Sequence, residues 1–297
     1  MRSDVAQFNL SAPPSLDAVL AQLAAEPGKH TPIAGGTELM VALNTGRLTQ
    51  HSLVSIHQLK ELRFIRAEQD AIHIGSGATF TDIRRSAEIA ADLPLLIESA
   101  SWTGTIANQN RATLGGNICN ASPAADTPPA LLAYGASITL ISASATAGKI
   151  ATRTLPYTEF HLAYKKTVLR PEELVHSVSV PRNFSGYRQY IRKVGTRNAL
   201  AISKIALAAL AKLDGDALAD IRLGAASLTD RPVRCSAAEA ALLGKSVGPK
   251  AMDATVRAAR AALASETHTI DDIRSTAKYR SAVAGNLLEE FLRSLAV

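Results

Sequence analysis

The chain has 297 residues, 47% of them hydrophobic and 20% charged, so it can bury a sizeable core and form about two domains. Its formal net charge is +6, but the Lys and Arg residues are scattered and only 4% of the residues are aromatic. This composition disfavours nucleic-acid binding, which needs a basic footprint and stacking side chains. The two cysteines, Cys119 and Cys235, lie far apart and support neither a disulfide framework nor a cysteine-ligated cluster.

The N-terminal segment carries Asp4 and a double proline where a secretory signal needs an unbroken apolar run. A second apolar run, at 205–211, lies in a stretch that we expect to be helical. It is bounded by Lys204 and Lys212 and is far too short to cross a bilayer. We therefore expect a cytoplasmic protein without a membrane span.

Helical and β-type patterns alternate through the first half of the chain. In chain order we expect a helix at 16–26 capped by Ser15, a short strand before Gly35, strands at 51–59 and 71–79, and a helix from Thr81 to about Ser101. Thr81 is expected to cap this last helix.

The second half adds strands and then a long helical region. We expect a helix that ends near Gly135 and feeds a strand, strands around 148–160 and at 173–181, 186–197 and 217–235, and helices through most of the last third. The order of elements predicts an α/β or α+β fold. Composition changes place domain boundaries near 53–58 and 174, which gives three units, 1–55, 56–174 and 175–297.

Two glycine pairs, at 35–36 and 115–116, each precede small hydroxyl and amide residues. Without a Cβ, the backbone N–H groups of such a pair can approach a ligand closely. The Rossmann fingerprint is absent, because Gly75 and Gly77 are followed by Phe80 where glycine or alanine is required. Neither pair continues into the Gly-Lys-Ser/Thr of a P-loop.

Both loops could supply hydrogen-bond donors to an anion. Gly35, Gly36 and Thr37 offer consecutive amides at the end of a strand, and residues 38–43 could form a helix whose dipole adds to them. The second set of donors comprises Thr113, Gly115, Gly116 and Asn117. Two facing sets would suit a pyrophosphate, whereas Asp126 suits a ribose or ribityl hydroxyl. For either loop alone, an ordinary tight turn remains the simpler interpretation.

Five blocks of the sequence resemble the flavin subunit, or flavin domain, of the molybdenum hydroxylases, the xanthine dehydrogenase and carbon monoxide dehydrogenase group. They occur in the same order as in that family and span essentially the whole chain. The blocks are "PIAGGTELM" at 32–40, "NRATLGGNICNASPAAD" at 110–126, "LRPEELVHSVSVP" at 169–181, "YIRKVGTRNALAISKIALAA" at 190–209 and "TAKYRSAVAGNLL" at 276–288. The chain departs from the family at 107–109, where it reads Ala-Asn-Gln and relatives often have Gln-Ile-Arg. It also lacks the cysteine-rich insertion of 4-hydroxybenzoyl-CoA reductase, which disfavours that activity.

The resemblance implies an α+β fold. An FAD-binding region of two α/β subdomains, of the PCMH or vanillyl-alcohol-oxidase type, precedes a C-terminal domain with a three-stranded antiparallel sheet and a helical bundle. By position in the matching blocks, the implied FAD contacts are Ile33, Ala34, Gly35, Gly36, Thr37, Glu38, Leu39, Met40, Gly104, Thr113, Leu114, Gly115, Gly116, Asn117, Asp126, Leu169 and Lys193. Lys193 is then a candidate cation beside the isoalloxazine, where it would favour anionic reduced flavin.

The resemblance also implies an activity and partners. A large subunit would carry molybdopterin, a small subunit two [2Fe–2S] clusters, and this chain the FAD that receives their electrons and hands them to an external acceptor. The implied assembly is a dimer of heterotrimers. No side chain here need be a catalytic acid or base, and the single histidines have no metal-ligand spacing. Two alternatives stay open: a stand-alone FAD-dependent oxidase or reductase acting on a small organic substrate, and a nucleotide-binding module without redox chemistry.

Overall fold

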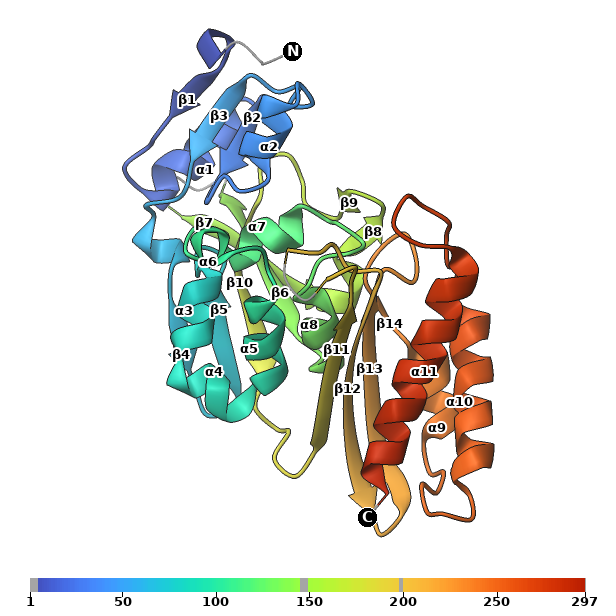
Figure 1. Cartoon of the computed structure of the whole chain (residues 1–297). Coiled ribbons are helices and arrows are strands. Elements are labelled where there is room, and N and C mark those ends of the chain that lie inside the picture. Colours follow the sequence, from blue (N-terminus) through green and yellow to red (C-terminus); the bar gives the residue numbers. More distant parts are fainter. Residues whose placement is uncertain (1–4, 145–148, 198–199, 297) are drawn as a thin grey trace.

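The computed structural model describes residues 5–144, 149–197 and 200–296. Figure 1 shows a small N-terminal unit, a middle sheet covered by helices, and a C-terminal sheet covered by long helices. The N-terminal unit comprises the 3-10 turn η1 (Val5–Gln7), β1 (Asn9–Ser11), α1 (Leu16–Ala25), β2 (His30–Ile33), α2 (Leu39–Asn44) and β3 (Ser52–Ser55). Its three strands pair in parallel in the order β1-β3-β2. Parallel pairing places the carboxyl end of β2 and the following glycine pair at one edge of this sheet.

Helix α1 forms where its apolar spacing predicts. Ser15 caps it by accepting a hydrogen bond from the Ala18 amide at 3.2 Å. The buried face carries Leu16, Val19, Leu20 and Leu23. These side chains join Val54 and, from the middle unit, Leu62 in a core that the two units share.

The middle unit is built on a five-stranded antiparallel sheet in the order β4-β5-β10-β6-β7. Its elements are η2 (Lys60–Leu62), β4 (Ile65–Ala67), β5 (Ala71–Gly75), α3 (Phe80–Arg85), α4 (Ala87–Asp92), α5 (Pro94–Ser101), α6 (Ile106–Gln109), α7 (Leu114–Cys119), α8 (Pro128–Ala133), β6 (Ser137–Ala143), β7 (Ile150–Pro156), η3 (Tyr157–Glu159), β8 (His161–Ala163), β9 (Lys166–Thr167) and β10 (Leu174–Pro181). Residue 148, where we expected a strand to begin, lies outside the described residues. The expected boundary at 174 falls at the first residue of β10, which is the central strand of this sheet.

Our prediction of a single helix from Thr81 to Ser101 is wrong, because the segment forms three short helices. Thr79, not Thr81, caps α3 in a capping box with Asp82, with hydrogen bonds of 3.1 Å and 2.9 Å. Ser86 ends α3 and caps α4, and Pro94 begins α5 at a position where its missing N–H is harmless.

The C-terminal unit contains β11 (Arg188–Val194), β12 (Ile205–Asp214), β13 (Ala217–Ala226), β14 (Val233–Arg234), α9 (Ser236–Leu242), α10 (Met252–Glu266) and α11 (Ala277–Leu295). The run at 205–211, expected to be helical, is instead a central strand. Both of its faces are buried: Ala208 and Leu210 pack into the core of the middle unit, while Leu207 and Ala209 pack towards α9–α11. A strand covered on both sides reads as a continuous apolar run, which hides its alternation. The three-stranded sheet is present and gains the two-residue β14 as a fourth strand.

Helix α8 joins the middle and C-terminal units. It packs against β12 and β13, and its residues are buried throughout. Gly224 of β13 allows this close approach, because an added Cβ would lie 2.1 Å from the carbonyl oxygen of Pro129. The expected α+β fold class is confirmed. None of the helices within the described ranges has the length and apolarity to cross a membrane.

Candidate functional site

The two glycine loops meet, as their donor character suggested they could. The backbone of Gly35 lies directly against the segment that enters the second loop, since an added Cβ would lie 1.8 Å from the Arg111 carbonyl oxygen. Arg111 closes the contact by donating from Nε to the Gly35 carbonyl at 3.2 Å. Only glycine allows the N-terminal unit to approach the middle unit this closely.

The first loop leaves its amides free. Gly36 has φ +74°, which turns the chain from β2 into α2, and its carbonyl accepts from the Met40 amide at 2.9 Å. The N–H groups of residues 35–38 have no acceptor among the residues that the structure describes. Successive unpaired amides at such a turn form a concavity that suits an anion.

The second loop differs from our expectation, because its backbone amides already donate hydrogen bonds to acceptors within the chain. Leu114 and Gly115 donate to the carbonyls of Ala78 and Ser76, both at 2.9 Å. Gly116 donates to Oγ1 of Thr113, the N-cap of α7, at 3.1 Å. The expected row of free backbone donors is therefore not found here.

What the second loop offers instead is room. A Cβ at Gly115 would lie 2.6 Å from the Ser76 Cβ, so this glycine is needed for packing. A Cβ at Gly116 would meet only Thr113 Oγ1, at 3.2 Å. Gly116 itself is exposed. Asn117 accepts a 2.6 Å hydrogen bond from Thr127 through Oδ1, which orients its side-chain amide. A ligand can thus lie directly against the Gly116 backbone.

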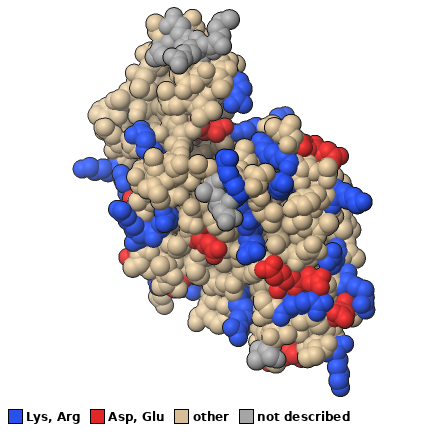
Figure 2. Space-filling view, in the orientation of Figure 1, with Lys and Arg blue, Asp and Glu red and all other residues tan. Residues whose placement is uncertain are grey.

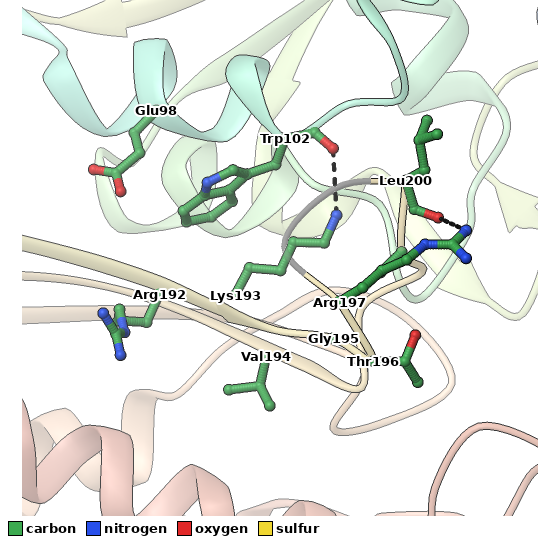
Figure 3. Close-up of a pocket in the computed structure, with 10 residues that line it drawn as sticks. Glu98, Trp102, Arg192, Lys193, Val194, Gly195, Thr196, Arg197 and Leu200 are labelled. Carbon is green, nitrogen blue, oxygen red and sulfur yellow. Dashed lines mark hydrogen bonds between the residues drawn. The ribbon is translucent and has the colours of Figure 1, made fainter.

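Asp126 and Lys193 form a buried ion pair. Their carboxylate and ammonium groups are 2.8 Å apart, and the side chains are 13% and 10% exposed. Burial raises the pKa of Asp126 to about 6, against the opposing attraction of Lys193. Lys193 also approaches the carbonyl of Trp102 at 3.4 Å (Figure 3). The pair joins the segment after α7 to β11, so the Lys193 charge is largely compensated by Asp126.

A cleft of about 520 Å³ lies beside this pair. In Figure 3, Glu98 and Trp102 at the end of α5 face β11 and the segment that follows it. Arg192 and Arg197 give its wall an excess of positive charge over Glu98, since Lys193 is paired with Asp126. Figure 2 likewise shows Lys and Arg side chains gathered along the middle of this face. The sequence did not predict Glu98, Arg192 and Arg197 as site residues. They belong to no local motif, because the fold brings the end of α5 and the end of β11 together.

The remaining expected contacts lie around this region. Gly104 occupies a turn with φ +60° before α6, and Leu169 packs on the core of the middle unit. No hydrogen bond within the described ranges joins either residue to a glycine loop. Lys165 was not foreseen. It lies 3.7 Å from the Glu38 carboxylate and donates to Asn120, so it links the segment after the first glycine pair to the end of α7.

Two converging glycine loops, with amides at residues 35–38 that find no acceptor among the described residues, suit an anionic ligand. Comparison with known protein families identifies the class of the protein. A model of the FAD-binding domain in molybdopterin dehydrogenase matches residues 6–183, and one of the CO dehydrogenase flavoprotein C-terminal domain matches residues 190–295. The chain therefore belongs to this family of FAD-binding flavoproteins, as the sequence blocks indicated, and its cofactor is FAD.

Curated relatives match along most of the chain. The glyceraldehyde dehydrogenase medium chain of Sulfolobus acidocaldarius is 29% identical over 266 residues, covering 89% of this chain and 90% of the relative. The xanthine dehydrogenase FAD-binding subunit of Escherichia coli O157:H7 is 32% identical, covering 70% of each chain. The structure of carbon monoxide dehydrogenase from Hydrogenophaga pseudoflava lacking the Mo-pyranopterin moiety superimposes with a TM-score of 0.88, at 28% identity and 95% coverage of both chains.

Proposed function

We propose that this chain is the electron-transfer subunit of a molybdenum-containing hydroxylase or dehydrogenase. Its FAD would accept electrons from the [2Fe–2S] clusters of a small partner subunit, and an external acceptor would remove them. A large subunit would carry the molybdenum cofactor, and the assembly would be a cytoplasmic dimer of heterotrimers. The observation that carries this proposal is the convergence of the two glycine loops, in a chain whose relatives are FAD-binding subunits and medium chains.

The residues present fit FAD. The free amides of residues 35–38 would hold the pyrophosphate, and the open face of Gly116 would let it lie against the second loop. Asp126 would accept from a hydroxyl of the cofactor, and Lys193 would keep that carboxylate ionised. The complete set of proposed contacts is Ile33 to Met40, Gly104, Thr113 to Asn117, Asp126, Leu169 and Lys193.

Bound FAD supplies two-electron redox chemistry, and the chain contributes binding, orientation and charge. Trp102 and the start of the segment after β11 line the cleft. Arg192 and Arg197 supply the positive potential that the compensated Lys193 does not. In this proposal Lys193 would act on the cofactor through its ion pair with Asp126, and not as the isolated cation that the sequence led us to expect.

The test is electron transfer in the absence of an organic substrate. The FAD-loaded chain is mixed anaerobically with the chemically reduced iron–sulfur subunit of its complex, and bleaching of the flavin absorption is followed. We expect full bleaching by the reduced subunit and none by aldehydes, purines or other small organic substrates added alone. Rapid bleaching by such a substrate without a partner would instead establish a stand-alone oxidase or reductase.

A further inference from the structure

Two successive peptide groups of the first glycine loop have carbonyls that are held in different ways. The Gly36 carbonyl accepts from the Met40 amide at 2.9 Å, and this bond is part of the turn that begins α2. The Gly35 carbonyl accepts instead from a side chain of another segment, Arg111 Nε, at 3.2 Å. Local backbone therefore fixes one peptide group, and a residue distant in the sequence fixes the other.

The direction of each N–H group follows from the carbonyl of the same peptide, because the two point to opposite sides of a trans peptide. The bond from Arg111 to the Gly35 carbonyl thus directs the Gly36 N–H away from the guanidinium. This N–H finds no acceptor in the described part of the chain. Gly35 is buried, whereas Gly36 is partly exposed. Arg111 consequently lies behind the peptide group, and the free N–H lies on its other side.

A peptide group between two glycines is easily turned over, because neither residue has a Cβ that restricts the rotation. In the observed orientation Gly36 has φ +74°. Turning the group over would bring Gly36 to negative φ values, which every residue can adopt. The Gly35 carbonyl would then point where the Gly36 N–H points now. A carbonyl oxygen in that place would repel the phosphate that the N–H attracts.

The backbone around Arg111 is fixed by hydrogen bonds of its own. The residue lies between α6 and α7, in the part of the middle unit that faces the N-terminal unit (Figure 1). The amides of Arg111 and Ala112 donate to the Asn108 carbonyl at 3.0 Å and 2.7 Å, and the Ala112 carbonyl accepts from the Phe80 amide at 3.1 Å. The guanidinium therefore reaches the Gly35 carbonyl from a rigid base.

We propose that Arg111 is a positioning residue for FAD. It holds the peptide group between Gly35 and Gly36 in the orientation that presents the Gly36 N–H to the pyrophosphate. The inference rests on the placement of the pyrophosphate in the proposed function, and not on the identity of the electron donor. A donor at the position of Nε is what this task requires, whereas the positive charge of the side chain is secondary.

Two substitutions separate the donor from the charge. In Arg111→Gln, the uncharged Nε2 stands as many bonds from Cα as the arginine Nε and can donate to the Gly35 carbonyl. In Arg111→Met, a methyl group stands at that place. Each FAD-free chain is titrated with FAD, and the flavin fluorescence gives the affinity. We expect Arg111→Met to bind FAD roughly tenfold more weakly, and Arg111→Gln to stay within about threefold of the wild type.

Melting temperatures of the FAD-free chains serve as the control and should be alike. The ratio of the wild-type and Arg111→Met affinities should also stay nearly constant between low and high salt, since Arg111 acts through a peptide group. A glutamine variant as weak as the methionine variant would show that the charge matters, and would overturn the proposal. Wild-type affinity in Arg111→Met would overturn it as well.

If Arg111→Met does not fold, Arg111→Ala takes its place with the same expected loss of affinity. Failure of both variants to fold would assign Arg111 to the stability of the fold and refute the positioning role. None of these results bears on electron transfer from the iron–sulfur subunit. Absence of that transfer in the wild type, together with the expected titrations, would refute the proposed function and leave the role of Arg111 intact.

Discussion

The loop at 33–40 and the loop at 113–117 share a glycine pair but use their backbones in opposite ways. Within the described part of the chain, the amides of residues 35–38 of the first loop have no acceptors. The second loop donates the amides of residues 114–116 to two carbonyls and a hydroxyl of the same chain. Gly35 and Gly115 permit close packing, and Gly36 and Gly116 face more open space. A glycine pair in a sequence therefore does not reveal which of its two residues serves the ligand.

The largest expected effect is at Gly35. Gly35→Ala places a Cβ against the Arg111 carbonyl and must separate the two loops, so we expect about 3 kcal/mol of lost stability and no retained FAD. Urea unfolding and flavin absorption measure both quantities. Gly116→Ala is the matched control, with nearly wild-type stability. A Gly35→Ala protein that melts like the wild type and is still yellow would contradict the close contact.

Asp126 should make stability depend on pH. Its folded pKa of about 6 lies above the ordinary value of 3.8, so between these values the folded state binds more protons than the unfolded state. Stability should therefore fall as pH rises from about 4 to about 6 and then level off. Asp126→Asn should remove about 2 kcal/mol of this fall in stability. This is less than the full pKa shift of Asp126 implies, because the side chain keeps some solvent contact. Urea unfolding of the FAD-free chain across this range measures the slope. An identical slope in both proteins would refute the assignment.

Gly116 tests the open face of the second loop. Gly116→Val projects a branched side chain towards the proposed pyrophosphate while meeting only Thr113 within the protein. We expect FAD affinity to fall at least about tenfold, close to 1.4 kcal/mol, with little change in melting temperature. Titration with FAD, followed by quenching of its fluorescence, gives the affinity. Full flavin content in this variant would refute the assignment of the loop.

Thr113 should produce the smallest effect. Thr113→Val removes the N-cap of α7 and the acceptor of the Gly116 amide, which costs about 1 kcal/mol of stability. FAD affinity should change less than about threefold, because the hydroxyl is directed towards Gly116 rather than outward. Thr113→Ser, which keeps the hydroxyl, is the control. Unchanged stability with a large loss of affinity would show that the hydroxyl contacts the ligand.

Local patterns predicted much of the fold. Apolar spacing and the Ser15 cap predicted α1, because this helix buries one face. Alternation of apolar and polar residues predicted β5 and β10, because both are regular strands. The pattern failed at β12, where burial of both faces removes the alternation that marks a strand. It also failed at residues 79–101, because helix-compatible residues continue across each break between α3, α4 and α5.

The site was predictable in part for a different reason. The sequence blocks named the two loops, Asp126 and Lys193, but spacing along a chain does not show that these last two side chains touch. Nor does it show where amide hydrogens are directed, since that depends on the carbonyls of Ser76 and Ala78 in another segment. The cleft residues Glu98 and Arg192 carry no local signal, because only the packing of α5 beside β11 creates the space between them.

The contact of Gly224 with Pro129 bears on how the cofactor is loaded. Because the β13 backbone rests on the start of α8 without an intervening side chain, the C-terminal sheet has no room to tilt inward over the middle unit. We therefore expect the gap between α5 and β11 to keep its width when FAD binds. Loading would consequently require side-chain movement at the cleft mouth rather than a swing of one domain. A bulky residue at position 224 would widen the gap permanently and lengthen the distance that an electron must travel.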